Sequence, residues 1–395
     1  MEGSVGTESL FTREPLLSIV APSRNDDHGG NLLGRMQLFV SGLLEQCQRH
    51  QLNAELVLVE WNPPQDRPRL AEALSWPVKD GPLAGQACGV RIIEVPAEIH
   101  RRFKHSDQLP LFQMIAKNVG IRRARGEFVL ATNVDILFSD ELVAFLASGK
   151  LEKGVLYRAD RYDVPPDVPI GAPLDERMSF CKTNFFRICC RDGSLDLAAN
   201  DFYAVHSPAH PPPPPGPLYL TYRALAALMP RPVKKPLKRL PIIREEVADL
   251  TGQMARASGT ERLHTNACGD FQLMSREDWF RLRGYPELEM FSMHLDSLLC
   301  YTAYHAGIRE IVLGKPCQVF HIDHSAGWSP QTERDQSLWK RLDKVGIPTL
   351  SREQFMGLAR RMSREHQPII FNDENWGLAR EDLAQTTKGC APNAR

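Results

Sequence analysis

One stretch of the sequence decides the fold: Glu127-Phe128-Val129-Leu130-Ala131-Thr132, followed directly by Asn133-Val134-Asp135. Its continuous run of apolar residues predicts a strand that is buried on both sides. Such strands are typical of parallel sheets that are covered by helices on both faces. In these sheets, ligands bind beyond the carboxyl ends of the strands, so the polar residues after Thr132 stand where a ligand site is expected.

The chain on both sides of this strand alternates strands with helices. Short β-rich runs are separated by longer segments in which apolar residues recur every three or four positions. Strands are predicted at 17–21, 55–60, 91–95, 127–132, 268–274, 310–313 and 319–324, and helices at about 34–50, 108–124 and 293–306, with a short helix that Ser275 caps. This order predicts an α/β fold, in which one main domain has a mostly parallel, Rossmann-like sheet with helices on both faces.

Composition excludes several classes of protein. The 395 residues carry 48 Lys and Arg against 48 Asp and Glu, so the net charge of zero does not favour nucleic acid as a partner. The longest apolar stretches fall far short of the roughly 20 residues that span a bilayer, and the first residues show no pattern typical of a secretory signal. We therefore expect a cytoplasmic protein that binds no nucleic acid.

The residues after the strands favour a cation site. Asp135 and Asn133 offer oxygen atoms, and a hard cation such as Mg²⁺ or Mn²⁺ needs only one or two carboxylates when phosphates complete its shell. His321 and His324 form a His-x-x-His pair at a late strand, and an imidazole there is a candidate third ligand. The alternative is structural, since an Asp that ends a strand often forms a turn and a histidine pair often packs in a core.

Several motifs occur in an ordered set. They are Pro22-Ser23-Arg24-Asn25 after the first strand, Ala116-Lys117-Asn118-Val119-Gly120 with Ala124-Arg125-Gly126, and Gly269 to Leu273 with Gly284-Tyr285-Pro286-Glu287. Over about residues 15 to 328 this set resembles the nucleotide-sugar glycosyltransferases of the A fold, especially the broad family 2 group. The resemblance implies transfer of a hexosyl or N-acetylhexosaminyl group from a nucleotide-sugar, typically a UDP-sugar, to a hydroxyl of a glycan, lipid or small-molecule acceptor.

The resemblance also implies roles for single residues. It implies donor contacts from Pro22, Arg24, Asn25, Glu60, Asn118 and Asn133, with Glu60 at the base or the ribose. Asp135, with His321 as a further candidate, would hold Mn²⁺ or Mg²⁺. Asp296, in the first turn of a predicted helix, falls on the Asp of the family's Glu-Asp motif and would be the base of an inverting transfer. Two positions depart from the pattern, because Asn133 replaces the first Asp of Asp-x-Asp and Leu295 replaces the Glu before Asp296.

The resemblance divides the chain together with its composition, because a long Pro-rich and basic insertion is not a standard part of the family. We expect an N-terminal tail (1–14), a nucleotide-sugar-binding subdomain (15–150), a variable Pro-rich and basic insertion (151–262), an acceptor-side and catalytic subdomain (263–328) and a C-terminal helical tail (329–395). The density of proline in the insertion predicts no packed core there. Its basic stretch 231–239 offers a peripheral contact to an anionic surface.

Two other classes of protein share some of these features. A non-catalytic nucleotide-sugar-binding or scaffold protein on the same fold is favoured by Asn133, Leu295 and the proline tract. A sugar-nucleotide pyrophosphorylase would need a glycine-rich phosphate loop tight against the first strand, but Gly29-Gly30 lies too far along the chain. The glycosyltransferase hypothesis accounts for more of the motifs than either alternative.

Overall fold

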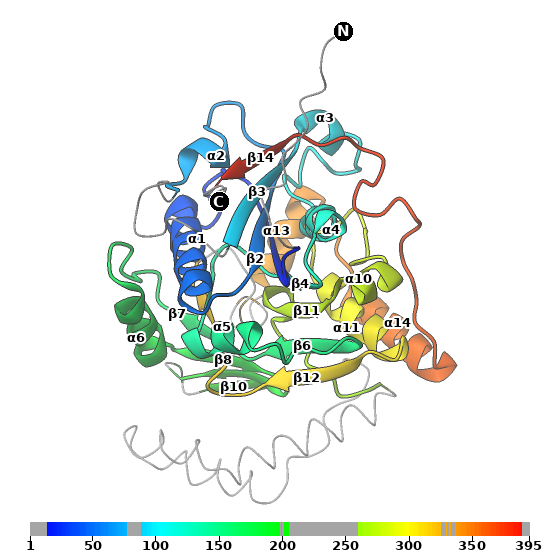
Figure 1. Cartoon of the computed structure of the whole chain (residues 1–395). Coiled ribbons are helices and arrows are strands. Elements are labelled where there is room, and N and C mark those ends of the chain that lie inside the picture. The colour runs from blue at the N-terminus through cyan, green and yellow to red at the C-terminus, as the bar shows by residue number, and fades with distance from the viewer. Residues whose placement is uncertain are drawn as a thin grey trace, which may run out of the picture.

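The computed structural model describes residues 14–76, 88–197, 199, 201–204, 260–324, 329, 332 and 336–388. Within these ranges two sheets and the helices around them form an α/β fold (Figure 1). The predicted fold class, a largely parallel sheet with helices on both faces, is confirmed. In the same ranges, no helix combines the length and the apolar character that a membrane crossing requires.

The main sheet contains eight strands of the described chain, in the order β12-β6-β11-β4-β1-β2-β3-β14. Its centre is parallel from β4 through β1 and β2 to β3, and β11 runs antiparallel between β4 and β6. The strands are β1 (Leu17–Ser23), β2 (Ala54–Trp61), β3 (Cys88–Val95), β4 (Phe128–Ala131), β6 (Val155–Ala159), β11 (Gln272–Ser275), β12 (Arg309–Leu313) and β14 (Gln385–Lys388). Because β1, β2 and β4 are parallel, their carboxyl ends lie on one edge of the sheet, as predicted.

A second sheet contains six strands of the described chain, in the order β10-β9-β8-β7-β13-β5. They are β5 (Ile136–Phe138), β7 (Arg161–Val164), β8 (Arg187–Cys190), β9 (Gly193–Asp196), β10 (Asp201–Ala204) and β13 (Val319–Ile322). In β13, His321 pairs with Ile136 on one side and with Asp163 on the other. This register brings β13 beside Asp135, which directly precedes β5.

Helices cover both faces of the main sheet (Figure 1). The helix α1 packs on residues such as Ile19 and Leu56, whereas α4 packs on the alternate residues such as Val20 and Val57. The helices are α1 (Leu32–Arg49), α2 (Leu70–Ala73), α3 (Ala97–His100), α4 (Gln113–Arg123), α5 (Asp140–Ala147), α6 (Leu174–Asn184), α10 (Arg276–Leu282), α11 (Leu295–His305), α13 (Ser337–Val345) and α14 (Arg352–Glu365). Successive side chains of each strand point to opposite faces of the sheet, so the two faces form two separate hydrophobic cores.

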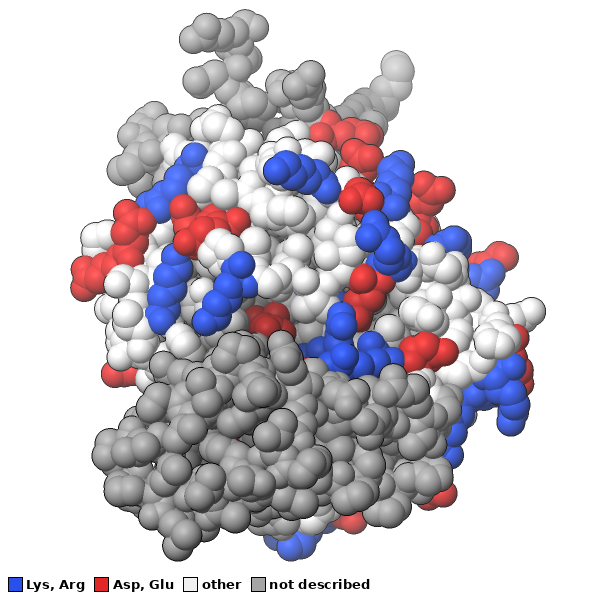
Figure 2. Space-filling model, turned by 90° about the horizontal axis from the view of Figure 1, so that it is seen from below, with Lys and Arg blue, Asp and Glu red and all other residues white. Residues whose placement is uncertain are grey.

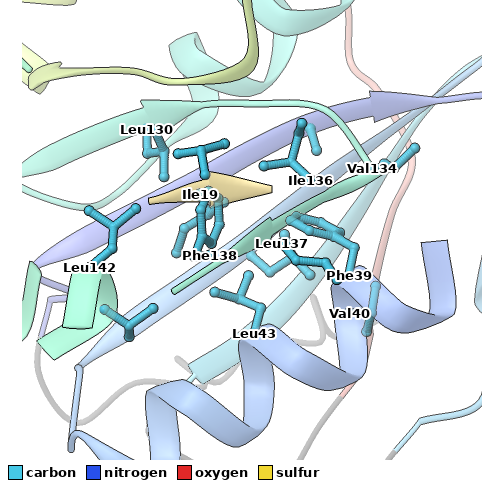
Figure 3. Close-up of a cluster of buried hydrophobic side chains, with 14 of the residues drawn as sticks. Ile19, Phe39, Val40, Leu43, Leu130, Val134, Ile136, Leu137, Phe138 and Leu142 are labelled. Atoms are coloured by element: carbon cyan, nitrogen blue, oxygen red, sulfur yellow. The ribbon is translucent and has the colours of Figure 1, made fainter. Parts of the chain in front are cut away.

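The core under α1 joins the two sheets. Phe39, Val40 and Leu43 of α1 lie against Phe138 of β5 and Ile19 of β1 (Figure 3). The rings of Phe39 and Phe138 meet edge to face with centroids 6.4 Å apart, which is a favoured aromatic arrangement. Each fully buried side chain of this kind stabilises the fold by roughly 1.5–3 kcal/mol. This packing fixes β5, and with it the loop that carries Asp135.

Two predictions on element type need correction. Residues 268–274 do not form one strand, because the 3₁₀ turn η1 (Cys268–Asp270) precedes β11. Thr132 donates to the carbonyl oxygen of Asp270 at 2.7 Å, and Asn133 donates to its carboxylate. These tertiary contacts hold the segment in a turn where its local pattern favours a strand.

The segment from residue 151 is also better packed than we predicted. Residues 151–204 supply five strands, β6 to β10, and the helix α6, with buried side chains such as Tyr157 and Val164. Pro165 and Pro166 lie just after β7, where a missing N–H breaks no ladder. The rest of the predicted insertion, 205–259 with its basic stretch, lies outside the described residues. Within its described residues, the predicted helical tail contains α13 and α14, followed by the strand β14, which pairs with β3.

Two glycines in helices give a paired test of this packing. A Cβ on Gly120 of α4 would overlap Cγ1 of Val20 and lie 3.0 Å from Cγ2 of Val59, whereas a Cβ on Gly357 of α14 would meet nothing within 4 Å. Gly120→Ala should lower the free energy of unfolding by about 1–3 kcal/mol, because the helix must move away from the sheet. Gly357→Ala should raise it by about 0.5–1 kcal/mol through helix propensity alone. Urea denaturation measures both, and equal effects of the two changes would contradict the packing.

Candidate functional site

Asp135, His321 and His324 form a cluster that can hold a metal ion. One ligand atom from each residue lies within 4.8 Å of the others. Oδ2 of Asp135 is 3.1 Å from Nε2 of His324 and 3.9 Å from Nε2 of His321. Two imidazoles and one carboxylate suit a divalent cation and leave positions open for the oxygens of a ligand. The sequence predicted Asp135 and His321, and the structure adds His324, the second member of the His-x-x-His pair.

A buried carboxylate orients His321. Nδ1 of His321 is 3.1 Å from Oδ1 of Asp163, so its Nε2 is directed toward Asp135. Asp163 is fully buried, and Arg161 and Arg187 contact its carboxylate at 2.8 and 2.7 Å. A carboxylate behind a metal-binding imidazole fixes the tautomer and the ring orientation of that imidazole. The cluster therefore has the support that metal ligands commonly have.

Charges in the cluster are strongly coupled. Burial opposes the ionisation of Asp135, but the hydrogen bond from His324 and the charge of His321 hold the pKa of Asp135 well below its usual range. Burial and the charge of Arg161 lower the pKa of His321, but Asp163 and Asp135 outweigh them and the pKa of His321 is raised. A bound cation would compete with protons for these side chains, because metal ligands must be deprotonated.

Asn133 lies beside this cluster and contacts a different carboxylate. Its Nδ2 donates to Oδ1 of Asp270 at 2.6 Å, and its Oδ1 accepts from Nε2 of Gln113 at 2.9 Å. Oδ2 of Asp270 accepts from Arg161 at 2.8 Å, and Arg161 also contacts Asp163. A continuous network therefore joins the metal cluster to η1. Neither Asp163 nor Asp270 was predicted as a site residue. The one signal in the sequence is that each is a charged residue beside apolar residues.

Asp296 lies at the other end of this network. It occupies the first turn of α11, as predicted, and Oδ1 accepts from the backbone N–H of Ser297 at 2.8 Å. Across from it, Nζ of the buried Lys117 donates to the carbonyl oxygen of Gly269 at 2.6 Å. Burial raises the pKa of Asp296, although the charge of Lys117 acts in the opposite direction. Cys268 hydrogen bonds to Asp296, so the backbone from Cys268 to Asp270 and the hydrogen bond between Asp270 and Asn133 connect Asp296 to the segment that carries Asp135.

The residues after β1 form a second polar group. Arg24 donates to the carbonyl oxygen of Asn62 at 2.7 Å and pairs with Asp26 at 2.8 Å, and Asn25 donates to the carbonyl oxygen of Pro68 at 3.0 Å. Oδ1 of Asn25 and Oγ of Ser23 are buried, and within the described chain they have no hydrogen-bond partner. Buried polar atoms without partners are costly, so these two atoms are suited to a ligand or a bound water.

Glu60 ends the neighbouring strand β2. Its Oε1 accepts from the N–H of Leu70 at 2.9 Å, and its side chain is buried. Burial raises the pKa of Glu60 to about 7, although the bond from Leu70 acts in the opposite direction. Pro22 is buried in β1. It would therefore affect a site through the backbone conformation at the end of this strand.

Asn118 contacts the interior of the protein. Its Oδ1 accepts from the N–H of Tyr285 at 2.8 Å, and its Nδ2 donates to the carbonyl oxygen of Tyr285 and to Glu287 at 2.8 and 2.9 Å. These bonds fasten α4 to the segment after α10. The role of Asn118 toward a donor stays a prediction.

The described part of one face carries charges of both signs. Figure 2 shows acidic and basic side chains interspersed over the described part of one face. This agrees with the net charge of zero. The candidate ligand sites are therefore the buried polar residues described above.

Comparisons with known proteins give a structural likeness but no relative by sequence. No protein-family profile matches the chain, and no curated protein matches its sequence. Among solved structures, the chain is similar to the catalytic domain of Drosophila beta1,4galactosyltransferase 7 in complex with xylobiose. The two share 10% sequence identity at a TM-score of 0.31, over 81% of this chain and 79% of that chain.

Glu60 predicts a pH dependence of stability. Its folded pKa of about 7 lies above the ordinary 4.5, so its contribution is fully present below 4.5 and is lost as the pH rises through 7. Between pH 5 and 8 the wild type should lose on the order of 2 kcal/mol relative to Glu60→Gln in urea denaturation. The exposed Glu353→Gln is the control and should follow the wild type. Parallel curves for the wild type and Glu60→Gln would contradict the assignment.

Proposed function

We propose that the chain is a glycosyltransferase of the A fold that transfers a sugar from a nucleotide-sugar, a UDP-sugar, to an acceptor hydroxyl. The observation that carries this proposal is the Asp135, His321 and His324 cluster at the carboxyl edge of parallel strands. The acceptor is a glycan, a lipid or a small molecule. The cytoplasmic location and the division into subdomains stay predictions from the sequence.

The cluster would hold Mn²⁺ or Mg²⁺. Two of its three ligands are imidazole nitrogens, which favour Mn²⁺ over Mg²⁺, since the smaller ion prefers oxygen. When bound, such a cation offsets negative charge on the nucleoside diphosphate that leaves. Asp163 and Arg161 would hold the ligand side chains in place whether or not the ion is bound.

The donor nucleotide would lie at the ends of β1 and β2. Ser23 and Asn25 support this position, because their buried oxygens lack partners in the described chain. Glu60 and Arg24 border the same strand ends, and Glu60 can carry a proton near neutral pH, which suits it to hydrogen bonding with a base or a ribose. Asn133 would stand between this donor region and the metal cluster.

Asp296 would be the base. Its raised pKa makes it a stronger proton acceptor than an ordinary Asp, and efficient general bases have a pKa near the working pH. It would accept the proton of the acceptor hydroxyl while that oxygen attacks the anomeric carbon from the face opposite the leaving diphosphate. The result would be inversion of configuration at that carbon.

Asp135→Asn tests the cation site. Removing the one carboxylate of the cluster should weaken Mn²⁺ binding, and with it Mn²⁺-dependent UDP binding, at least about 10-fold in calorimetric titration. The exposed Asp175→Asn on α6 is the control and should bind both normally. If the wild type binds UDP equally with and without Mn²⁺, the proposed role of the cation is wrong.

Asp296→Asn tests the base. UDP-sugar binding should remain within about twofold, whereas transfer or hydrolysis of UDP-sugars should fall by 10²- to 10⁴-fold, the range typical of a lost general base. Chromatography of released UDP measures the rate, and the exposed Asp343→Asn serves as the control. Normal turnover by the Asp296 variant would remove the assignment.

A non-catalytic nucleotide-sugar-binding protein is the second candidate. It is favoured by Asn133, whose amide is engaged with Asp270, and by Leu295, which is buried where the resembling family has a Glu. Stabilisation of the wild type by UDP with Mn²⁺, without release of UDP from any UDP-sugar over long incubation, would identify that candidate. Release of nucleoside triphosphate with pyrophosphate would instead identify a pyrophosphorylase.

A further inference from the structure

Lys117 is a buried cation inside the helix α4. Its side chain has no exposed surface, although it occupies a helix whose other buried residues are mostly apolar. Burying an ammonium group is costly unless nearby groups compensate its charge. Burial does lower the pKa of Lys117, while the charges of Asp270, Asp296 and Asp135 act in the opposite direction. The lysine therefore lies within the field of the metal cluster and of the proposed base.

Gly269 is the point where Lys117 and Asp296 approach each other. Nζ of Lys117 donates to the carbonyl oxygen of Gly269 at 2.6 Å. A Cβ on Gly269 would lie 2.8 Å from Oδ2 of Asp296 and 3.7 Å from Nζ of Lys117. Both distances, 2.8 and 3.7 Å, are measured from the same Cβ position. Nζ of Lys117 and Oδ2 of Asp296 are therefore at most about 6.5 Å apart. Because Gly269 has no side chain, the Asp296 carboxylate can lie close to this residue and to Lys117.

The other groups around Asp296 compensate it less. From β6, Arg158 faces the same interior, but its Nε and Nη1 donate to the carbonyl oxygens of His264 and Cys268, and its charge acts less on Asp296 than that of Lys117. The thiol of Cys268 in η1 hydrogen bonds to Asp296, and the N–H of Ser297 in α11 donates to it. The hydroxyl of Tyr285 and the thiol of Cys300 also face this interior, and neither group can carry a positive charge. Lys117 is thus the main positive charge near Asp296.

We propose that Lys117 is a positioning residue for Asp296: its ammonium holds the Gly269 carbonyl beside the Asp296 carboxylate, and its charge keeps that carboxylate ionised. This inference rests on the proposed function in one respect, which is that the ionised carboxylate of Asp296 accepts a proton. The hydrogen bond from Lys117 to Gly269, and the short distance from Asp296 to both residues, do not depend on the substrate.

The variants Lys117→Met and Lys117→Arg test this inference. The first removes the charge with little change in length, and the second keeps the charge. The readout is the ¹³C chemical shift of the Asp296 carboxyl group as a function of pH, assigned by its loss in Asp296→Asn. At about 6.5 Å and an intermediate effective dielectric, removal of the charge should move the titration of Asp296 up by about one to two pH units. Lys117→Arg should stay within about half a unit of the wild type.

Activity gives a second readout. The acidic limb of the pH profile of kcat for UDP-sugar turnover should move in the same direction and by a similar amount in Lys117→Met. Lys153→Met, a change at an exposed lysine next to Glu127 and Glu277, should leave both the titration and the profile unchanged. An unchanged Asp296 titration in a folded Lys117→Met protein overturns the inference.

Gly269→Ala keeps the test decisive if Lys117→Met does not fold. The added Cβ should push the Asp296 carboxylate away from Lys117 and move its titration up while the lysine is retained, and an unchanged titration overturns the inference. A wild type that turns over no UDP-sugar defeats the proposed function, yet the NMR titration still decides the role of Lys117.

Discussion

The buried carboxylate of Asp163 is the constraint on which the candidate site depends. A charge without solvent must be compensated by the protein, and Arg161, Arg187 and His321 contact Asp163 from three directions. These partners come from β7, β8 and β13, so one carboxylate ties three strands of the second sheet together. Arg161 extends the same compensation to Asp270. One set of buried charges therefore fixes a candidate metal ligand, the second sheet and the turn before β11.

The two sheets contribute different parts of the site. The main sheet places Asp135 after β4 and the group around Asn25 after β1, because parallel strands end on one edge. The second sheet brings His321 back from a distant part of the chain by pairing β13 between β5 and β7. The core that Phe39 and Phe138 share holds the sheets at their junction. Rigid elements thus carry the chemistry, and its residues come from segments that the sequence keeps far apart.

Much of the main sheet could be predicted from the sequence, and most of the second sheet could not. The strands β1, β2 and β4 are continuous apolar runs, and Ser275 caps α10 as its spacing to Asp278 predicts. The second sheet is built of short strands that contain Arg161, Asp163 and Arg187, and such charges locally indicate solvent-exposed chain. Their burial depends on partners that only the tertiary fold supplies.

The predicted site residues differ in how far the sequence alone could identify them. Asp135, His321 and Asp296 carry their chemistry in their own side chains, so their residue type and position at element ends indicated them. Asn118 matched a motif, but its side-chain hydrogen bonds join α4 to the segment after α10. Lys117 stands next to it in the same motif and lies closer to the candidate chemistry. A motif locates a region, whereas packing decides which of its side chains faces the site.

The strand β14 has a consequence for how the molecule meets other molecules. It pairs antiparallel with β3, and Gln385 accepts from Arg91 at 3.0 Å. Without it, β3 would present a row of free N–H and C=O groups, the kind of border onto which a second chain can add. The last strand of the described chain thus covers the edge of β3 and should hinder the pairing of β3 with another molecule. This segment lies far from the candidate site in the sequence.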